Sequence, residues 1–246
     1  MRSPFLKALV CWPTFFVVLA ISLLLGLGTW QLQRLAWKEA MITQINKQLA
    51  EPPVSIEEIL GCASEPQACE FRKIVVTGHY DHAQEAHLYG RTRGGKPMTH
   101  LVTPFVLSSG SVILVDRGWV PESVDMKTLT PVAGELTLHG YIRQKSARNT
   151  FTPNNNYEKN RLFSVEPTEW AREKKVTTLL PFYLVLEVKD SDQLFPRPSD
   201  ALTLGLRNFH LSYAITWYML ALALLVLYVF YIRKNISASP PQREDE

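Results

Sequence analysis

Cys11 to Trp30 reads CWPTFFVVLAISLLLGLGTW, and the predicted architecture of the chain starts from this apolar run. No Asp, Glu, Lys or Arg occurs from Ala8 to Gln33, so the run exceeds the ~20 apolar residues that a helix needs to cross a bilayer. A cleaved signal peptide is the alternative, because Arg2 and Lys7 precede the run. Signal peptides usually have a shorter apolar core and a small-x-small cleavage site, which favours a retained transmembrane helix over 11–30.

A second uncharged stretch, from Leu211 to Ile232, lies near the other end of the chain. Its aromatic residues gather at the two ends of the stretch: Tyr213, Trp217 and Tyr218 at the start, and Tyr228, Phe230 and Tyr231 at the finish. Aromatic belts at both edges are typical of a membrane span, and a buried core helix is the alternative. The pattern predicts a second transmembrane helix over 211–232.

Basic residues flank both stretches on the side of the chain ends. Arg2 and Lys7 precede the first stretch, and Arg233 and Lys234 follow the second. Positively charged flanks usually stay in the cytoplasm, so we expect both termini there. Arg34, beyond the first stretch, weakens this signal without reversing it, because long segments are translocated largely regardless of their own charge.

The sequence therefore predicts a membrane protein with two transmembrane helices flanking a mostly antiparallel β (α+β) domain. The expected divisions are a cytoplasmic tail over 1–10, a span over 11–30, a periplasmic domain over 31–210, a span over 211–232 and a disordered cytoplasmic tail over 233–246. No Arg- and Ser-rich leader precedes the first span, which favours a bacterial plasma membrane over an organelle.

Within the domain, the residue pattern changes from helical to strand-like spacing. Apolar residues at helical intervals predict that the first helix continues outward until Pro52 and Pro53. Strands are expected over 71–80, 100–107, 111–120, 135–143 and 182–188, with a hairpin at Ser108–Gly110 and a short helix over 167–175 that begins at Pro167. We expect a stiff linker over 195–200 that leads into the second span.

Short catalytic motifs and a strongly basic surface are both missing from the sequence. The net charge of +3 is small and dispersed, which does not support nucleic-acid binding. The chain lacks GxSxG, Walker, HExxH and CxxC motifs. His79, Asp81 and His82, with His87 nearby, are the best candidate for a zinc site, although a strand end followed by an Asp turn explains them as well.

Two cysteines of the outward domain can form a disulfide. Cys62 and Cys69 enclose the short loop GCASEPQAC, and oxidation is permitted outside the cytoplasm. A pair of free thiols is the alternative. The spacing and the lack of a third ligand argue against zinc.

Two further residues have ligand-binding chemistry. Arg117 follows a very apolar strand and presents a planar guanidinium suited to a carboxylate, although such an Arg more often pairs with a neighbouring Asp or Glu. His210 is expected at the outer mouth of the second span, where an imidazole can bind a haem iron or a group on another helix. Tyr213 and Trp217 follow at one and two helical turns and are expected on the same face. An interfacial His satisfied by headgroups and water is the alternative.

Several blocks of residues, in order along nearly the whole chain, resemble the surfeit locus protein 1 family of cytochrome c oxidase assembly factors. The blocks are GTWQL from Gly28 with Arg34-Leu35 and Trp37-Lys38; Gly78-x-Tyr80-Asp81-His82; Thr103-Pro104-Phe105; Val115-x-Arg117-Gly118-Trp119-Val120-Pro121; Phe151-x-Pro153-x-Asn155 with Asn160; and Leu206-Arg207-Asn208-x-His210-Leu211-x-Tyr213-x-x-Thr216-Trp217-Tyr218. The last block is the most specific. After Asn160 the chain departs from the family's Trp-rich pattern and reads RLFSVE.

The resemblance implies a non-enzymatic role in building the haem a-containing subunit of the oxidase. It implies that haem a is bound transiently and handed to subunit I, with His210 as the axial ligand of the iron. Haem a synthase is a possible donor. From position we expect Arg207 to meet the haem propionates, and Tyr213 and Trp217 to wall the ring. Two alternatives remain: a haem-independent scaffold for nascent oxidase subunits, and a periplasmic metal-dependent enzyme that uses the His79 cluster.

Overall fold

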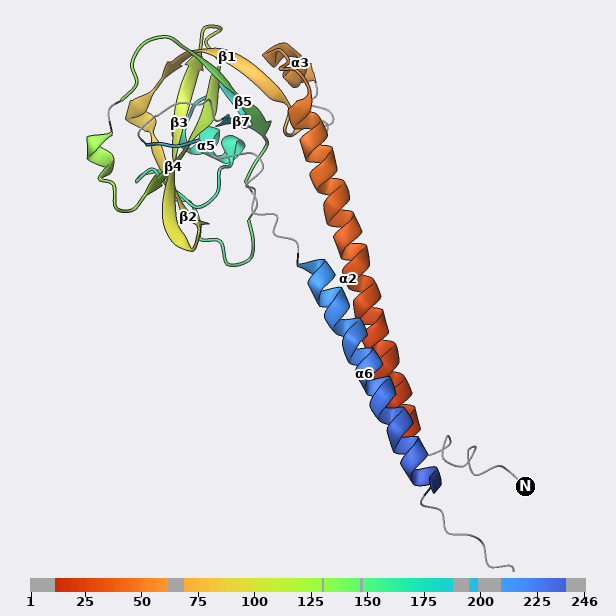
Figure 1. Cartoon of the computed structure of the whole chain (residues 1–246). Helices are drawn as coiled ribbons and strands as arrows, with labels where there is room; N and C mark the ends of the chain where they lie inside the picture. Colours follow the sequence, from red (N-terminus) through yellow and green to blue (C-terminus); the bar gives the residue numbers. More distant parts are fainter. Residues whose placement is uncertain are drawn as a thin grey trace, which may run out of the picture. The chain divides into compact units, whose positions relative to one another are not determined.

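The structure is a computed structural model that describes residues 12–61, 69–129, 131–146, 148–187, 195–198 and 209–237. It divides into two compact units, one of residues 1–43 with 206–246 and one of residues 44–205. The first unit contains the long C-terminal helix and residues 12–43 of the long N-terminal helix, and the second contains the end of the N-terminal helix and the β-sheet (Figure 1). This confirms the predicted fold class of two terminal helices around a mostly antiparallel β domain.

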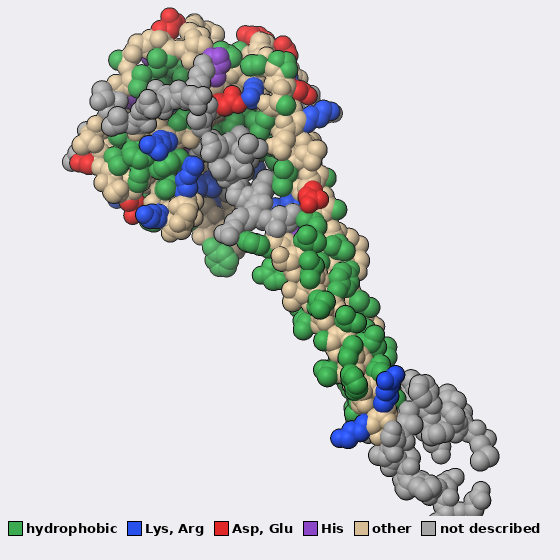
Figure 2. Space-filling model, viewed as in Figure 1, with side chains coloured by type: hydrophobic (Ala, Val, Ile, Leu, Met, Phe, Trp, Pro, Cys, Tyr) green, Lys and Arg blue, Asp and Glu red, His purple; other side chains and the backbone are tan. Residues whose placement is uncertain are grey.

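Helix α2 runs without interruption from Trp12 to Ala50, and helix α6 runs from His210 to Ser237. Each contains a window that is long and apolar enough to span a membrane, and only 6% of each window is buried. Figure 2 shows hydrophobic side chains over the visible face of these helices. The predicted continuation of the first helix beyond the apolar run is confirmed, because α2 ends just before Pro52 and Pro53, which cannot continue a helix.

The β domain is built on one sheet with the strand order β1-β5-β7-β4-β3-β2-β6. The strands span Lys73–Tyr80 (β1), Ala86–Arg93 (β2), Lys96–Leu107 (β3), Val112–Pro121 (β4), Leu136–Arg143 (β5), Arg161–Leu162 (β6) and Leu179–Leu186 (β7). Neighbouring strands are antiparallel except for the pairs β4–β7 and β2–β6, which are parallel. The expected hairpin is confirmed as β3–β4.

An additional pairing between β1 and β3 closes β1, β5, β7, β4 and β3 into a ring. Gly78 pairs with Leu107 at this junction, and a β-carbon built at Gly78 would lie 2.0 Å from the carbonyl oxygen of Val106. Only glycine permits so close a backbone approach. The closed ring removes the free edges of these strands.

The domain core lies on both sides of the central strands. Alternate residues of β4 illustrate this, because Ile113 and Val115 belong to one apolar cluster and Leu114 to the other. The second cluster is covered by helix α5, Pro167–Lys174, whose Trp170 is 1% exposed. Burial on both faces explains why the sequence of β4 is apolar without alternation.

Three short helices complete the described domain: α3 (Ile56–Gly61) and the 3-10 turns η2 (His82–Gln84) and η3 (Met126–Thr128). The segment 195–198 is more than a linker, because Arg197 forms backbone hydrogen bonds with Trp119 in both directions, at 2.8 and 3.0 Å. Gly118 allows this approach, since a β-carbon there would lie 2.0 Å from the carbonyl oxygen of Arg197.

Candidate functional site

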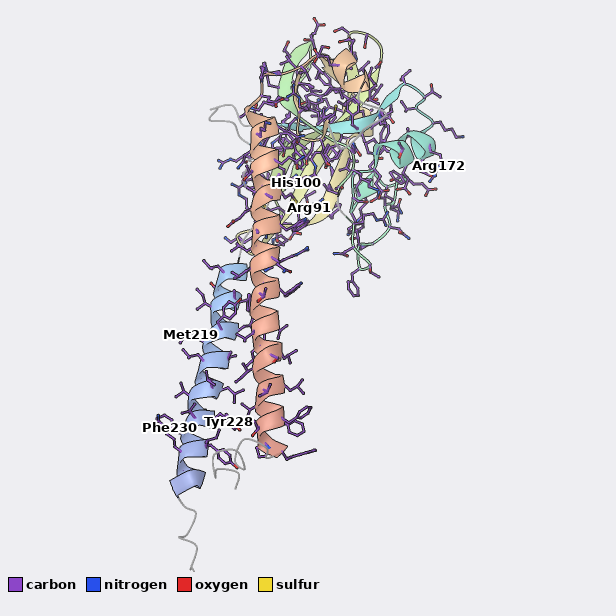
Figure 3. All side chains as sticks on the ribbon, turned by 90° about the vertical axis from the view of Figure 1, so that its right-hand side faces the viewer. Arg91, His100, Arg172, Met219, Tyr228 and Phe230 are labelled. Atoms are coloured by element: carbon purple, nitrogen blue, oxygen red, sulfur yellow. The ribbon has the colours of Figure 1, made fainter. Side chains whose placement is uncertain are left out.

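The two membrane-type helices pack against each other as an antiparallel pair. The ring of Tyr218 on α6 lies over Gly28 on α2, and the Tyr218 hydroxyl is 3.2 Å from Oγ1 of Thr29. Nearer the opposite end of the pair, the hydroxyl of Tyr228 bonds Oγ1 of Thr14. Figure 3 shows Tyr228 on the side of α6 that faces α2, whereas Met219 and Phe230 point away.

The less exposed residues of both helices alternate at intervals of three and four. This is the spacing of helices that pack knobs into holes. On α2 this series is Thr14, Val17, Ile21, Leu24, Gly28 and Gln31, and on α6 it is His210, Ala214, Trp217, Ala221, Leu224 and Tyr228; Ala20, Leu27 and Tyr218, next to the series, are also partly buried. We call this series the seam.

A polar pair, His210 and Gln31, lies in the seam at the N-terminal end of α6. Nδ1 of His210, the first residue of α6, is 2.7 Å from Oε1 of Gln31 on α2. An amide oxygen can only accept a hydrogen bond, so Nδ1 carries the proton. In the neutral imidazole the lone pair then belongs to Nε2. Sequence reasoning identified His210 but missed its partner.

Trp217 shares the seam with His210, but Tyr213 does not. Trp217 follows His210 by two helical turns, and its indole Nε1 is buried without a hydrogen-bond partner in the part of the chain that the structure describes. Tyr213 is 56% exposed. Tyr213 follows His210 by three residues, about 60° short of a full turn, and lies beside the seam rather than in it. Trp217 therefore faces α2 together with His210, whereas Tyr213 borders that face and is exposed.

Of the two arginines that the sequence analysis named as ligand-binding candidates, the structure describes only Arg117. Arg207 lies outside the described residues. Arg117 is buried in the β domain, where its Nη1 donates to Oε2 of Glu85 at 2.7 Å. Its guanidinium also lies over the ring of Tyr80, 4.9 Å from the centroid. Arg117 therefore has the neighbouring carboxylate that the sequence analysis named as the alternative to ligand binding.

Glu85 is the centre of a polar network inside the β domain. Its Oε2 accepts a hydrogen bond from Oγ1 of Thr103 at 2.8 Å, in addition to the bond from Arg117, and lies 3.5 Å from Nδ1 of His82. Burial raises the pKa of Tyr80 to about 12, although the positive charge of Arg117 opposes the shift. The phenol therefore stays protonated at neutral pH. These contacts join residues from separate sequence blocks into one structural unit.

The possible zinc ligands near the end of β1 are engaged in turn contacts. Asp81 caps the turn η2 by accepting from the backbone N–H of Ala83 at 3.1 Å and from Nε2 of Gln84 at 2.9 Å. Nε2 of His82 is 3.0 Å from the carbonyl oxygen of Val132. Among the described residues, no three His, Cys, Asp or Glu side chains lie together as a metal site.

Cys69 is disulfide-bonded and buried in the domain core. Its expected partner, Cys62, lies outside the described residues.

The sequence of this chain, with its two long helices and its β domain, is similar to that of known proteins. The sequence model of the SURF1 family matches residues 18–222, which include α2 from Val18 onward, the whole β domain and α6 as far as Leu222. The chain belongs to the SURF1 family. Membership supports a role in cytochrome c oxidase assembly, the function that the resemblance implied, and a membrane location.

Individual SURF1 relatives match over nearly the whole chain. The chain is 32% identical to a SURF1-like protein of Rickettsia felis over 229 residues, which cover 90% of this chain and 97% of the relative. It is 32% identical to surfeit locus protein 1 of Gallus gallus and 29% identical to that of Mus musculus, and each match covers 72% of the relative. The resemblance stated from the sequence blocks is therefore confirmed.

Proposed function

We propose that this SURF1-family protein binds haem a transiently through His210 and delivers it to subunit I of cytochrome c oxidase. The observation that carries the proposal is the Gln31–His210 hydrogen bond, which leaves the imidazole with its lone pair on Nε2. Neutral imidazole is a common axial ligand of haem iron. The protein would make and break no covalent bond in the cargo, so the proposed role is not enzymatic.

The residues around His210 fit such a ligand. Bound haem would supply an iron that takes an axial nitrogen, together with a large apolar ring. Trp217 presents a buried indole N–H, and the exposed ring of Tyr213 adds apolar area beside the seam. We include Arg207 as a candidate partner for the propionates and leave Arg117 out, because Glu85 and Tyr80 already contact its guanidinium.

We further propose that the helices cross a bacterial inner membrane with both ends of the chain in the cytoplasm and the β domain in the periplasm. Arg233 and Lys234 at the end of α6 support this orientation through the positive-inside rule. A reporter enzyme fused after Lys234 would test it. Activity of the reporter only on the periplasmic side would overturn the orientation.

Removal of His210 tests the haem proposal. The full chain, its His210→Ala variant and its His79→Ala variant are produced together with haem a synthase and purified in detergent. We expect a haem spectrum for the wild type and for His79→Ala, whose imidazole is exposed on β1, and its loss for His210→Ala. Haem content that is the same in all three proteins would refute the assignment of His210.

A haem-independent scaffold is the second candidate, and one surface residue favours it. Phe151 is 92% exposed. The turn that presents Phe151 is ordered by Asn149, whose Oδ1 accepts from the Phe151 N–H at 2.9 Å and whose carbonyl oxygen accepts from the Thr152 N–H at 3.0 Å. A fixed, exposed aromatic ring is a typical anchor for a partner protein.

Co-purification separates the two candidates. If the protein is a scaffold only, subunit I is retained without haem, and Phe151→Ala weakens its retention. If it carries haem, the Soret band accompanies the wild type, and His210→Ala removes the band while Phe151→Ala does not.

A further inference from the structure

We infer that Gln31 is the positioning residue for His210: its amide oxygen, on the first membrane helix, fixes the imidazole of the second helix in the tautomer that presents Nε2 to haem iron. This inference rests on the proposed function, because it concerns the same ligand. It adds a residue from α2, a helix on which the sequence analysis named no site residue.

The geometry of the pair carries the inference. The distance of 2.7 Å between Nδ1 and Oε1 is at the short end of the range for N–H···O hydrogen bonds. Both side chains are half-buried in the seam. Hydrogen bonds are electrostatically stronger in such a low-dielectric setting, and an unpaired polar group there is costly. The neutral imidazole is therefore held in one tautomer and one ring orientation.

The register of the helix pair keeps Gln31 opposite His210. Gly28 lies one helical turn before Gln31 on the same face of α2, and the ring of Tyr218 lies over it. The contact between Thr29 and Tyr218 adds a second fixed point. A slide of one helix along the other would break these contacts together with the Gln31–His210 bond.

The acceptor also changes the electronic character of the ligand. When Nδ1–H donates to an oxygen, electron density at Nε2 rises and the imidazole becomes a stronger donor to a metal. A stronger donor stabilises ferric iron more than ferrous iron, which lowers the reduction potential of bound haem. Loss of such an outer partner typically weakens metal binding by about 10- to 100-fold.

The test uses the full chain in detergent with haem a as the probe. The variants are Gln31→Leu, which removes the acceptor, and Gln31→Glu, which offers a stronger one. Gln33→Leu is the matched control, because Gln33 lies two residues further along α2 and is exposed. The measurements are the dissociation constant for haem a and the midpoint potential of the bound haem.

We expect Gln31→Leu to bind haem a about 10- to 100-fold more weakly than the wild type and with a more positive potential. Gln31→Glu should bind at least as tightly as the wild type and with a more negative potential, and Gln33→Leu should match the wild type. If the hydrogen bond sets the potential, the midpoint potential should be highest for Gln31→Leu, intermediate for the wild type and lowest for Gln31→Glu. A role in helix packing alone would not produce this order.

Three results distinguish failure of this inference from failure of the proposed function. If wild type binds no haem a, or if His210→Ala binds it as tightly as the wild type, the proposed function fails. If the wild type binds through His210 but Gln31→Leu has the same affinity or an unchanged potential, the role of Gln31 is refuted. If Gln31→Leu does not fold by circular dichroism, Gln31→Glu decides, and a potential equal to that of wild type refutes the role.

Discussion

The phenol ring of Tyr218 lies so close to Gly28 that a β-carbon built at Gly28 would be 2.8 Å from two ring atoms. Gly28 is also the one buried residue of α2 in the described chain. Glycine at this position therefore allows an aromatic side chain of α6 to reach the backbone of α2. Small residues at close helix crossings are common in membranes.

Gly28→Ala should destabilise the helix pair by about 1–3 kcal/mol, because the added methyl group overlaps the ring. Gly26→Ala is the matched control, since nothing lies within 4 Å of a β-carbon there. This control should be neutral or slightly stabilising, because alanine favours helix over glycine. Unfolding of the purified full chain in increasing SDS, followed by circular dichroism, measures both. Equal midpoints for the two variants would contradict the close contact.

The ion pair of Arg117 and Glu85 should be costly to break. Arg117 is 7% exposed, so Glu85→Ala leaves a buried charge without its partner, and we expect a loss of about 3–5 kcal/mol in unfolding free energy. Arg172→Ala is the control on α5, because its side chain is 72% exposed beside Glu173 and such pairs contribute less than about 1 kcal/mol. Thermal or urea unfolding measures both. A Glu85→Ala loss no larger than that of Arg172→Ala would refute the buried pair.

Alkaline pH should destabilise the β domain through its buried tyrosines. Burial raises the pKa of Tyr80 and of Tyr183 to about 12 in each case. In the unfolded chain a phenol titrates near pKa ~10, so the unfolded chain loses its proton first as the pH rises. The stabilising contribution is complete below about pH 10 and declines from there to about pH 12, by up to about 1.4 kcal/mol per pH unit for each tyrosine.

Tyr80→Phe tests this pH dependence, because it removes one titrating phenol and retains the ring below Arg117. Unfolding free energy measured in urea at pH 9 and pH 11 should fall less steeply for the variant than for wild type. Identical slopes would show that Tyr80 keeps its ordinary pKa in the native state.

Reduction or loss of the Cys69 disulfide should destabilise the domain. Cys69 is 6% exposed and packs in the cluster with Ile59 and Ile74. We expect Cys69→Ser to cost about 2–4 kcal/mol in unfolding free energy. If Cys62 is the partner, then Cys62→Ser should cost a similar amount, and the double variant should cost little more than either single one. Additive losses would exclude this pairing.

The sequence predicted those parts of the fold that depend on local pattern. Ser108–Gly110 between two apolar runs identified the β3–β4 hairpin, and Pro167 at the first turn identified α5. Strand β2 was missed, because Gly90, Arg91 and Arg93 make its outer half resemble a loop. Its structure follows from pairing with β3, which is not a local property.

The candidate site shows the same division between local and distant information. His210 could be singled out because an imidazole at the end of an apolar run is unusual. Gln31 could not be singled out in this way, because 179 positions separate it from His210. Neither segment, read by itself, shows which residues of the other helix it faces. The register of the two helices depends on Gly28 and Tyr218, whose contact appears only when the helices are packed.

The bridge between Trp119 and Arg197 limits how far the start of α6 can move from the β domain. Pro198 is the last residue described beside that bridge, and α6 begins at His210. A chain of 12 residue steps extends at most about 3.3–3.6 Å per residue, or roughly 40 Å in total. His210 therefore stays within that radius of Pro198, whichever way the helices and the β domain are arranged.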